Sequence, residues 1–246
     1  MGELIAVVSG KGGTGKTSFC AGVSIALANA GLRVLCIDCD VGLRNLDISL
    51  GMSDTGALSF LDVSEGTYSL AHAPKHPLYP NLSFLTAPMN RPLDLIDIDA
   101  LTAMLRDARG LFDYIILDSA AGIDTGFQLV ATISDRFLLV TGSGPAAIRD
   151  ATRVGEVLEK MGKTDIRLVV NRVNKSMMTL LKVTIDDVMD TAGLPLLGIV
   201  PEDEDVPLAA ACQLPLLRYS KRAPATKAYY RISKRIQGLP EPITLR

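Results

Sequence analysis

The sequence GKGGTGKT, from Gly10 to Thr17, decides the fold. It follows the apolar run LIAVV at residues 4–8, which is typical of a strand buried on both faces. It precedes an alanine-rich stretch at residues 18–30 that predicts a helix. A strand, a glycine loop and a helix in this order, with the pattern G-x-x-x-x-G-K-[ST] at the turn, predict a phosphate-binding loop. An ordinary glycine-rich turn, the alternative, does not need every position of the pattern to be filled.

The residue types in this loop suit a nucleoside triphosphate. Glycines let successive backbone N–H groups converge on a phosphate, and the start of the helix adds the positive end of its dipole. Lys16 can reach the β- and γ-phosphates, and the Thr17 hydroxyl suits a magnesium ion. We therefore expect nucleotide contacts from Gly12, Gly13, Thr14, Gly15, Lys16, Thr17 and Ser18.

The composition fits one large α/β domain. Of the 246 residues, 48% are hydrophobic and 21% are charged, which allows a substantial core. We find no run of about 18 apolar residues that would predict a membrane span and no signal peptide. We expect a cytoplasmic protein, with peripheral placement at the inner face of the membrane as the other option.

The charge of the chain is nearly balanced but unevenly distributed. The formal net charge of −2 is not that of a polycation, so nucleic acid is not the expected partner. From Arg218 onward, however, eight Lys/Arg residues face a single acid, Glu241. The C-terminal end is therefore the basic part of the molecule.

The rest of the chain alternates between strand and helix patterns. Buried strands are predicted at residues 33–38, 82–86, 114–118, 137–140, 168–170 and 197–200, and helices at 97–109, 146–161 and 183–192. This rhythm predicts right-handed βαβ units in a single doubly wound, mainly parallel α/β sheet with helices on both faces. We expect one P-loop domain over residues 1–246, with a basic C-terminal helix at about 223–238.

Three carboxylates follow or end predicted strands. Asp38 and Asp40 come at the end of the strand at 33–38, and Asp118 ends the strand at 114–118. The carboxyl ends of parallel strands meet at one edge of the sheet, where doubly wound folds bind ligands. These acids are therefore expected beside the glycine loop.

The cysteines and histidines give weaker signals. Cys36 and Cys39 form a C-x-x-C pattern, which we interpret as buried thiols rather than a redox or metal pair. His72 and His76 are spaced by four residues, but Pro74 between them disfavours a common helix. We predict surface histidines rather than a metal site.

Lys11 makes the loop unusual and points to a family. The sequence KGGTGKT at 11–17 resembles the deviant Walker A motif of the MinD/ParA ATPases, although Lys11 taken alone could be a solvated loop lysine. Residues 38–47 (DCDVGLRNLD) are similar to switch I of the MinD branch. Residues 116–119 and 122–126 resemble its Walker B and switch II, and residues 169–172 and 200–203 resemble its two adenine-binding segments. These motifs cover essentially the whole chain in the correct order.

The resemblance implies a Mg²⁺-dependent ATPase that dimerises on ATP binding. Hydrolysis of ATP to ADP would switch the recruitment or positioning of an unidentified protein partner, in cell division or a related process. The implied catalytic residues are Lys11 acting across the dimer, Lys16, and Asp40 acting on water. The implied magnesium residues are Thr17, Asp38 and Asp118. The amide of Gly122 would sense the γ-phosphate, and adenine would be held by Asn171, Arg172, Pro201, Glu202 and Asp203.

Three departures from the family pattern stand out. Ala120 replaces a proline of switch II, and residues 142–145 read GSGP where an Asn-Pro-Glu-like turn is common. We expect the family's basic amphipathic C-terminal extension to be missing, which makes membrane association doubtful. The helix at residues 225–237 has one apolar face, and we expect that face to pack on the sheet rather than to anchor in a membrane.

Other functions on the same fold stay open. A ParA-like DNA-partitioning ATPase would use the basic C-terminal end. A metal-cluster carrier or reductase would need cysteines that pair across a dimer, but no cysteine lies between Cys39 and Cys212. A small-molecule ligase would need a second substrate pocket, for which we find no polar constellation.

Overall fold

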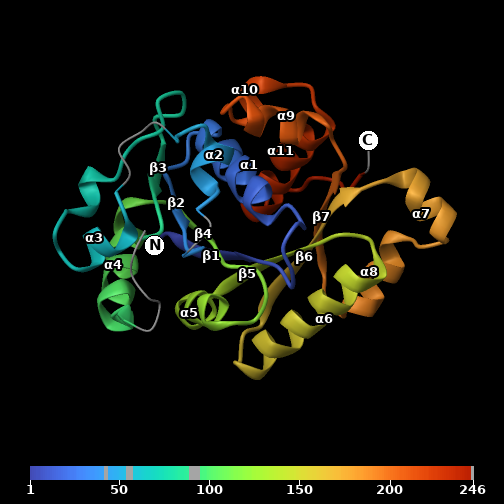
Figure 1. The fold of residues 1–246 in the computed structure, drawn as a ribbon, viewed down its shortest axis with the longest axis horizontal. Coiled ribbons are helices and arrows are strands. Elements are labelled where there is room, and N and C mark those ends of the chain that lie inside the picture. Colours follow the sequence, from blue (N-terminus) through green and yellow to red (C-terminus); the bar gives the residue numbers. More distant parts are fainter. Residues whose placement is uncertain (42–43, 54–57, 89–94, 245–246) are drawn as a thin grey trace.

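The fold is built on a parallel sheet of seven strands (Figure 1). The computed structural model describes residues 1–41, 44–53, 58–88 and 95–244. The strand order is β3-β2-β4-β1-β5-β6-β7, and every pairing between neighbours is parallel. The bounds are β1 Glu3–Val8, β2 Val34–Asp38, β3 Leu82–Leu85, β4 Tyr114–Asp118, β5 Arg136–Thr141, β6 Asp165–Val173 and β7 Leu196–Pro201. The predicted doubly wound α/β fold is confirmed.

Helices cover both faces of the sheet, and β1 shows why. Its side chains alternate, so that Ile5 and Val7 enter one half of the core while Ala6 and Val8 enter the other. The first face carries α1 (Lys16–Asn29), α2 (Leu46–Leu50), α9 (Asp205–Ala211), α10 (Leu216–Tyr219) and α11 (Pro224–Ile236). The second face carries α3 (Phe60–Ser64), α4 (Ile98–Leu111), α5 (Thr125–Ile133), α6 (Pro145–Lys160) and α8 (Ile185–Ala192). A short 3₁₀ helix, η1, spans Leu70–His72.

The strand register brings the predicted acids together. In the pairing of β1 with β4, Val7 lies opposite Asp118, and in the pairing of β2 with β4, Asp38 lies opposite Asp118. Because β4 is the neighbour of both β1 and β2, these strands end side by side. The glycine loop after β1 therefore starts next to both carboxylates.

The predicted helices are confirmed within a few residues, but several shorter helices were not predicted, α5 and α9 beside the site among them. The helix α9 has 7 residues and buries only Ala209, and α5 has 9 residues. Helices shorter than the window of about 11 residues over which a helical period is recognised give little signal in sequence. Among the helices of the described ranges, none has both the length and the apolar character needed to cross a bilayer.

The prediction of surface histidines is wrong for His76. His72 is exposed, but His76 is only 2% exposed. Its Nδ1 accepts a hydrogen bond from the backbone N–H of Leu78 at 3.0 Å, so the ring proton on Nε2 faces the carbonyl oxygen of Leu50 at 2.7 Å. Burial lowers the pKa of His76. The imidazole is thus a neutral link between the loop before β3 and the end of α2.

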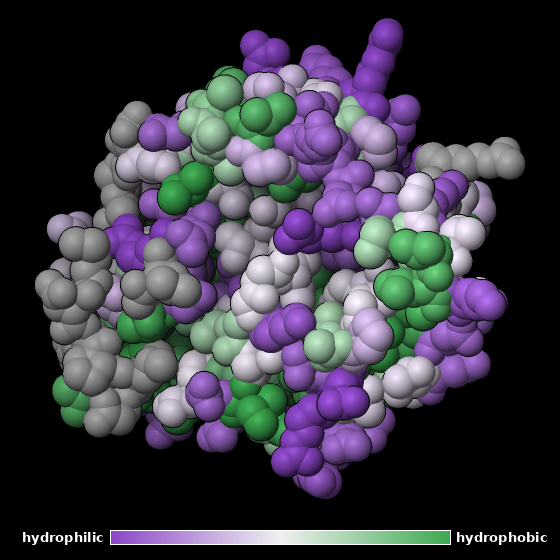
Figure 2. Space-filling view, turned by 45° about the vertical axis from the view of Figure 1, so that its right-hand side comes forward, coloured by the Kyte–Doolittle hydropathy of each residue, from purple (hydrophilic) through white to green (hydrophobic). Residues whose placement is uncertain are grey.

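The helix α7 (Lys175–Leu181) lies outside the two core layers. Only Met178 of this helix is buried, while Met177, Leu180 and Leu181 are exposed. Figure 2 shows hydrophobic (green) surface on its right-hand side, the side on which α7 lies in Figure 1. Its start is set by Asn174, whose side chain accepts from the N–H of Met177.

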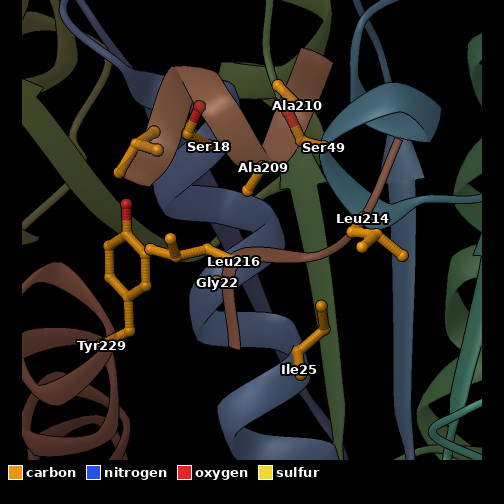
Figure 3. Close-up of a pocket in the computed structure, with 10 residues that line it drawn as sticks. Ser18, Gly22, Ile25, Ser49, Ala209, Ala210, Leu214, Leu216 and Tyr229 are labelled. Atoms are coloured by element: carbon orange, nitrogen blue, oxygen red, sulfur yellow. The ribbon is translucent and has the colours of Figure 1, made fainter. Parts of the chain in front are cut away.

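The C-terminal helix α11 packs on the phosphate-loop helix and on β7. Its apolar residues Ala225, Ala228, Tyr229, Ile232 and Ile236 are all buried, so the predicted packing of this face on the body of the protein is confirmed. Glycines make the close approach possible. A Cβ at Gly22 of α1 would overlap the Tyr229 ring, which lies beside α1 in Figure 3, and a Cβ at Gly198 of β7 would overlap Ile232.

The basic side of α11 is partly used inside the molecule. Lys234 pairs with Glu241 at 2.9 Å. The Arg235 guanidinium donates to the carbonyl oxygens of Leu197, Glu241 and Pro242, between 2.6 and 2.9 Å away. These bonds fasten the segment after α11 to the edge of β7.

We predict that Gly22→Ala destabilises the protein. Alanine is a better helix former than glycine, but the added methyl group would overlap a fully buried ring. Overpacking of this kind costs about 1–3 kcal/mol of unfolding free energy. Denaturant unfolding without nucleotide measures the effect.

The matched control is Gly110→Ala, at the exposed end of α4, where nothing lies within 4 Å of the added Cβ. This control should keep or slightly raise the stability. If Gly22→Ala were as stable as Gly110→Ala, α11 would not be seated on α1 as described.

Candidate nucleotide site

The glycine loop runs from the end of β1 to the start of α1 and is open on one side. Gly13 and Gly15 have φ angles of 81° and 80°, in the left-handed region that favours glycine. Apart from the adjoining residues, no atom of the described residues lies within 4 Å of where a Cβ of Gly12 or Gly13 would be. No side chain caps α1 at its N-cap residue, Gly15. The loop therefore offers a ligand both space and the N–H groups of a helix start.

A buried ion pair lies at the base of the loop. The Nζ atom of Lys16 is 2.5 Å from Oδ1 of Asp118, and the two side chains are 6% and 1% exposed. Burial alone would lower the pKa of Lys16, but the charge of Asp118 and the hydrogen bond to it outweigh burial and raise the pKa. The lysine is therefore held as a cation.

Two buried polar atoms, one in the loop and one in this pair, have no hydrogen-bond partner among the described residues. They are Oδ2 of Asp118 and the hydroxyl oxygen of Thr14. Buried polar atoms are nearly always satisfied in folded proteins, so exceptions call for an explanation. Thr14 belongs to the loop and Asp118 pairs with the loop lysine, so a phosphate group and its cation fit as partners for these atoms.

Asp38 and Asp40 extend the acidic edge. The Asp38 carboxylate accepts from the backbone N–H groups of Asp40 at 2.9 Å and Leu46 at 3.2 Å. Burial, and then repulsion by Asp118, raise the pKa of Asp38 to about 7. Burial also raises the pKa of Asp40, and the attraction of Lys16 opposes this effect. Gly42 and Leu43 of the switch I-like segment lie outside the described residues.

The residues proposed for magnesium suit this ion. Thr17 lies in the first turn of α1, while Asp38 and Asp118 end neighbouring strands. Within the described ranges, no cluster of three His, Cys, Asp or Glu side chains could hold a metal on its own. Mg²⁺ does not need such a cluster, because it is usually held by one or two carboxylates together with substrate phosphates and waters.

The C-x-x-C pattern is not a structural pair. Cys36 enters the core half that contains α1, where its sulfur lies 3.7 Å from that of Cys20. Cys39 enters the other half of the core, on the opposite face of the sheet. Both thiols are buried, as predicted.

A cavity beside the loop gathers the segments predicted to bind adenine. Its volume is about 790 Å³, in the range of small-molecule sites. It is lined by the predicted residues Gly15, Ser18, Asn171, Arg172, Pro201, Glu202 and Asp203. Sequence reasoning missed several other lining residues, namely Asn174, Lys175, Val206, Pro207, Ala210 and Tyr229. Tyr229 belongs to the apolar face of a helix, a pattern that predicts a core residue. None of the other residues in this list belongs to a recognisable motif.

Two of the predicted base contacts are already engaged within the protein. The Nδ2 atom of Asn171 donates to the carbonyl oxygens of Thr14 at 2.8 Å and Gly15 at 3.3 Å, which leaves Oδ1 for a base. The Asp203 carboxylate accepts from the N–H groups of Asp205 at 3.0 Å and Ala225 at 2.9 Å. Asp203 thus fastens the start of α11 to the cavity wall.

Lys11 was predicted to act across a dimer, and Gly122 was predicted to sense the γ-phosphate; Lys11 lies in the loop, and Gly122 lies next to Ser9 at its start. Lys11 is exposed. The backbone N–H of Gly122, expected to sense the γ-phosphate, donates to the carbonyl oxygen of Ser9 at 2.9 Å. Gly122 has a φ of 91°, which a non-glycine residue rarely adopts. A γ-phosphate would have to displace this hydrogen bond to reach the amide.

Comparisons with known proteins show the family of the chain. The family described as the CobQ/CobB/MinD/ParA nucleotide-binding domain matches residues 5–216. The septum site-determining protein MinD of Synechocystis is 35% identical over 244 residues, covering 98% of this chain and 92% of that protein. MinD in the MinC:MinD complex of Aquifex aeolicus superposes with a TM-score of 0.90 at 33% identity, covering 98% of each chain. MinD of Pyrococcus horikoshii, solved with Mg-ADP, gives a TM-score of 0.84 at 27% identity, covering 96% of each chain. The chain belongs to the MinD/ParA family of P-loop nucleotide-binding proteins.

Proposed function

We propose that this protein is a MinD-like ATPase that dimerises on ATP binding. Hydrolysis of ATP would end the dimer and so switch the recruitment or positioning of a protein partner, in cell division or a related process. The observation that carries the proposal is the buried Lys16–Asp118 pair, with an unpartnered carboxylate oxygen, at the base of an open glycine loop. Similarity to MinD proteins over nearly the whole chain supports it.

Within this proposal, the residues of the loop have distinct tasks. Lys16 exchanges Asp118 for phosphate oxygens when ATP binds, and the loop amides donate to the same phosphates. Thr17, Asp38 and Asp118 hold Mg²⁺, which supplies charge neutralisation at the phosphates when bound. Asp40 orients the attacking water.

The extra lysine ties hydrolysis to dimerisation. Lys11 is exposed in one subunit, so it can enter the site of a second copy, where it would neutralise charge that develops on the transferred phosphoryl group. The Gly122 amide would move from Ser9 to the γ-phosphate and so report which nucleotide is bound. The resulting ATPase would act as a timer because its active form is the dimer.

The partner and the location belong to the proposal as well. The Aquifex aeolicus MinD was solved in a complex with MinC, so a protein partner is proposed here too. Size-exclusion chromatography with ATP, ADP or no nucleotide, with and without anionic liposomes, tests the dimer and the membrane together. A protein that stays monomeric with ATP in every condition would contradict the proposed function.

We predict that Lys16→Ala removes measurable ATP hydrolysis and strongly weakens nucleotide binding. The variant loses the charge that faces the phosphates. It also leaves Asp118 buried and unpaired, which costs about 3–5 kcal/mol of stability. Lys16→Ala combined with Asp118→Asn should recover stability but not hydrolysis. Near-normal turnover in either variant would show that the chemistry occurs elsewhere.

We predict that Asp40→Ala keeps ATP binding and traps the dimer. Asp40 acts on water rather than on the phosphates, so the hydrolysis rate should fall by about 10²–10⁴ while affinity for ATP changes little. Chromatography with ATP checks whether the dimer is trapped, and a phosphate-release assay measures the hydrolysis rate. A variant that remains monomeric with ATP would contradict the role of Asp40.

We predict that Lys11→Ala separates nucleotide binding from dimerisation. ADP binding should persist, because Lys16 and the loop amides remain. Dimerisation and hydrolysis should fall, the latter by about 10²–10⁴ through loss of a transition-state contact. Lys221→Ala removes an exposed lysine far along the chain and should behave as wild type. If Lys11→Ala did so as well, Lys11 would be an ordinary loop lysine.

A further inference from the structure

Three successive carbonyl oxygens of the glycine loop accept hydrogen bonds from the end of β6, and the oxygen of Gly15 also accepts from the backbone N–H of Phe19 in α1. The Arg172 guanidinium donates to the oxygen of Gly13 at 3.1 Å. Asn171 donates to the oxygens of Thr14 and Gly15. Both side chains come from the same end of β6, and Asn171 is only 3% exposed.

Because of the geometry of the peptide bond, these hydrogen bonds also orient the N–H groups of the loop. In a trans peptide, the carbonyl of one residue and the N–H of the next point in opposite directions. Carbonyls of residues 13, 14 and 15 that face β6 therefore turn the N–H groups of Thr14, Gly15 and Lys16 away from β6. These are amides that a phosphate-binding loop must present to its ligand.

The backbone of Arg172 is held in a costly conformation. Its φ of 54° lies in the left-handed region, which costs a residue with a side chain about 1 kcal/mol or more. Its guanidinium also reaches Glu202 at 3.4 Å, and Asn174 donates to the other oxygen of Glu202 at 3.1 Å. Glu202 and Asn174 line the cavity beside the loop, so this arginine joins the cavity wall to the loop.

We propose that Asn171 and Arg172 are positioning residues that hold the loop amides toward the phosphates before a nucleotide arrives. This proposal rests on the proposed nucleotide function and adds a role that base recognition does not require. A loop that is already oriented loses less conformational entropy when the ligand binds. The two side chains thus raise the affinity for the phosphate chain itself, even for a ligand that has no base.

Inorganic tripolyphosphate with Mg²⁺ tests this point, because it carries phosphates without a base or ribose. Arg172→Gly removes the guanidinium at a backbone position that suits glycine. Its affinity for tripolyphosphate, measured by calorimetry, should fall about three- to tenfold. Asn171→Ser, which removes a buried donor, should lower it about tenfold or more. Arg172→Lys should restore part of the loss.

Lys182→Gly is the matched control. Lys182 is also a cation with a left-handed φ, 53°, and it is exposed at the end of α7. Replacing it removes the same charge and the same backbone cost but no loop contact, so tripolyphosphate affinity should stay within about twofold. Far-UV circular dichroism of each variant confirms that the fold is retained.

The outcomes separate the possible roles. The Arg172→Gly and Asn171→Ser variants could bind ADP more weakly but bind tripolyphosphate like wild type. In that case the two residues contact the base, and the positioning role is overturned. If only Arg172→Gly weakens tripolyphosphate binding, the arginine acts on the phosphates by its charge. That result also overturns the positioning role. A wild-type protein that binds neither tripolyphosphate nor ADP would instead refute the proposed nucleotide function.

Discussion

A charged lysine that is only 6% exposed needs a counter-charge, and Asp118 is the counter-charge of Lys16. This pair joins the helix after β1 to the end of β4, and it is possible only because the two strands are neighbours in register. Both side chains belong to the site, so the site is neutralised internally while it waits for a ligand. An arriving phosphate replaces one anion by another, and the lysine never has to remain buried alone.

The sheet and the loop were predictable because their signals are local. Strands of a parallel sheet are buried on both faces and read as apolar runs, and the phosphate loop is a contiguous motif. The order of the strands and the burial of His76 are decided by contacts between distant segments. The imidazole of His76 is buried because the carbonyl of Leu50 accepts from it, and no pattern around residue 76 contains that information.

The residues of the site also fall into a group that was predictable from local sequence and a group that was not. Asp38 and Asp118 were predicted beside the loop because each ends a strand, and strand ends converge. The cavity side was located by resemblance, yet what its residues touch was not foreseen. Asn171 bonds to loop carbonyls that lie 156 and 157 positions earlier in the chain. Asp203 binds the start of α11, an element whose position follows only from the folded sheet.

The position of α11 has a consequence for how the chain is made. The phosphate-loop helix α1 is buried along nearly its whole length, and the element that covers its outer side, α11, begins only at Pro224. During synthesis from the N-terminus, β1 and α1 leave the ribosome well before α11 does. An apolar helix therefore stays uncovered while all the intervening strands and helices are made, a period in which nascent chains attract chaperones and each other. The nucleotide site becomes a finished, protected structure only when this late helix closes over the earliest one.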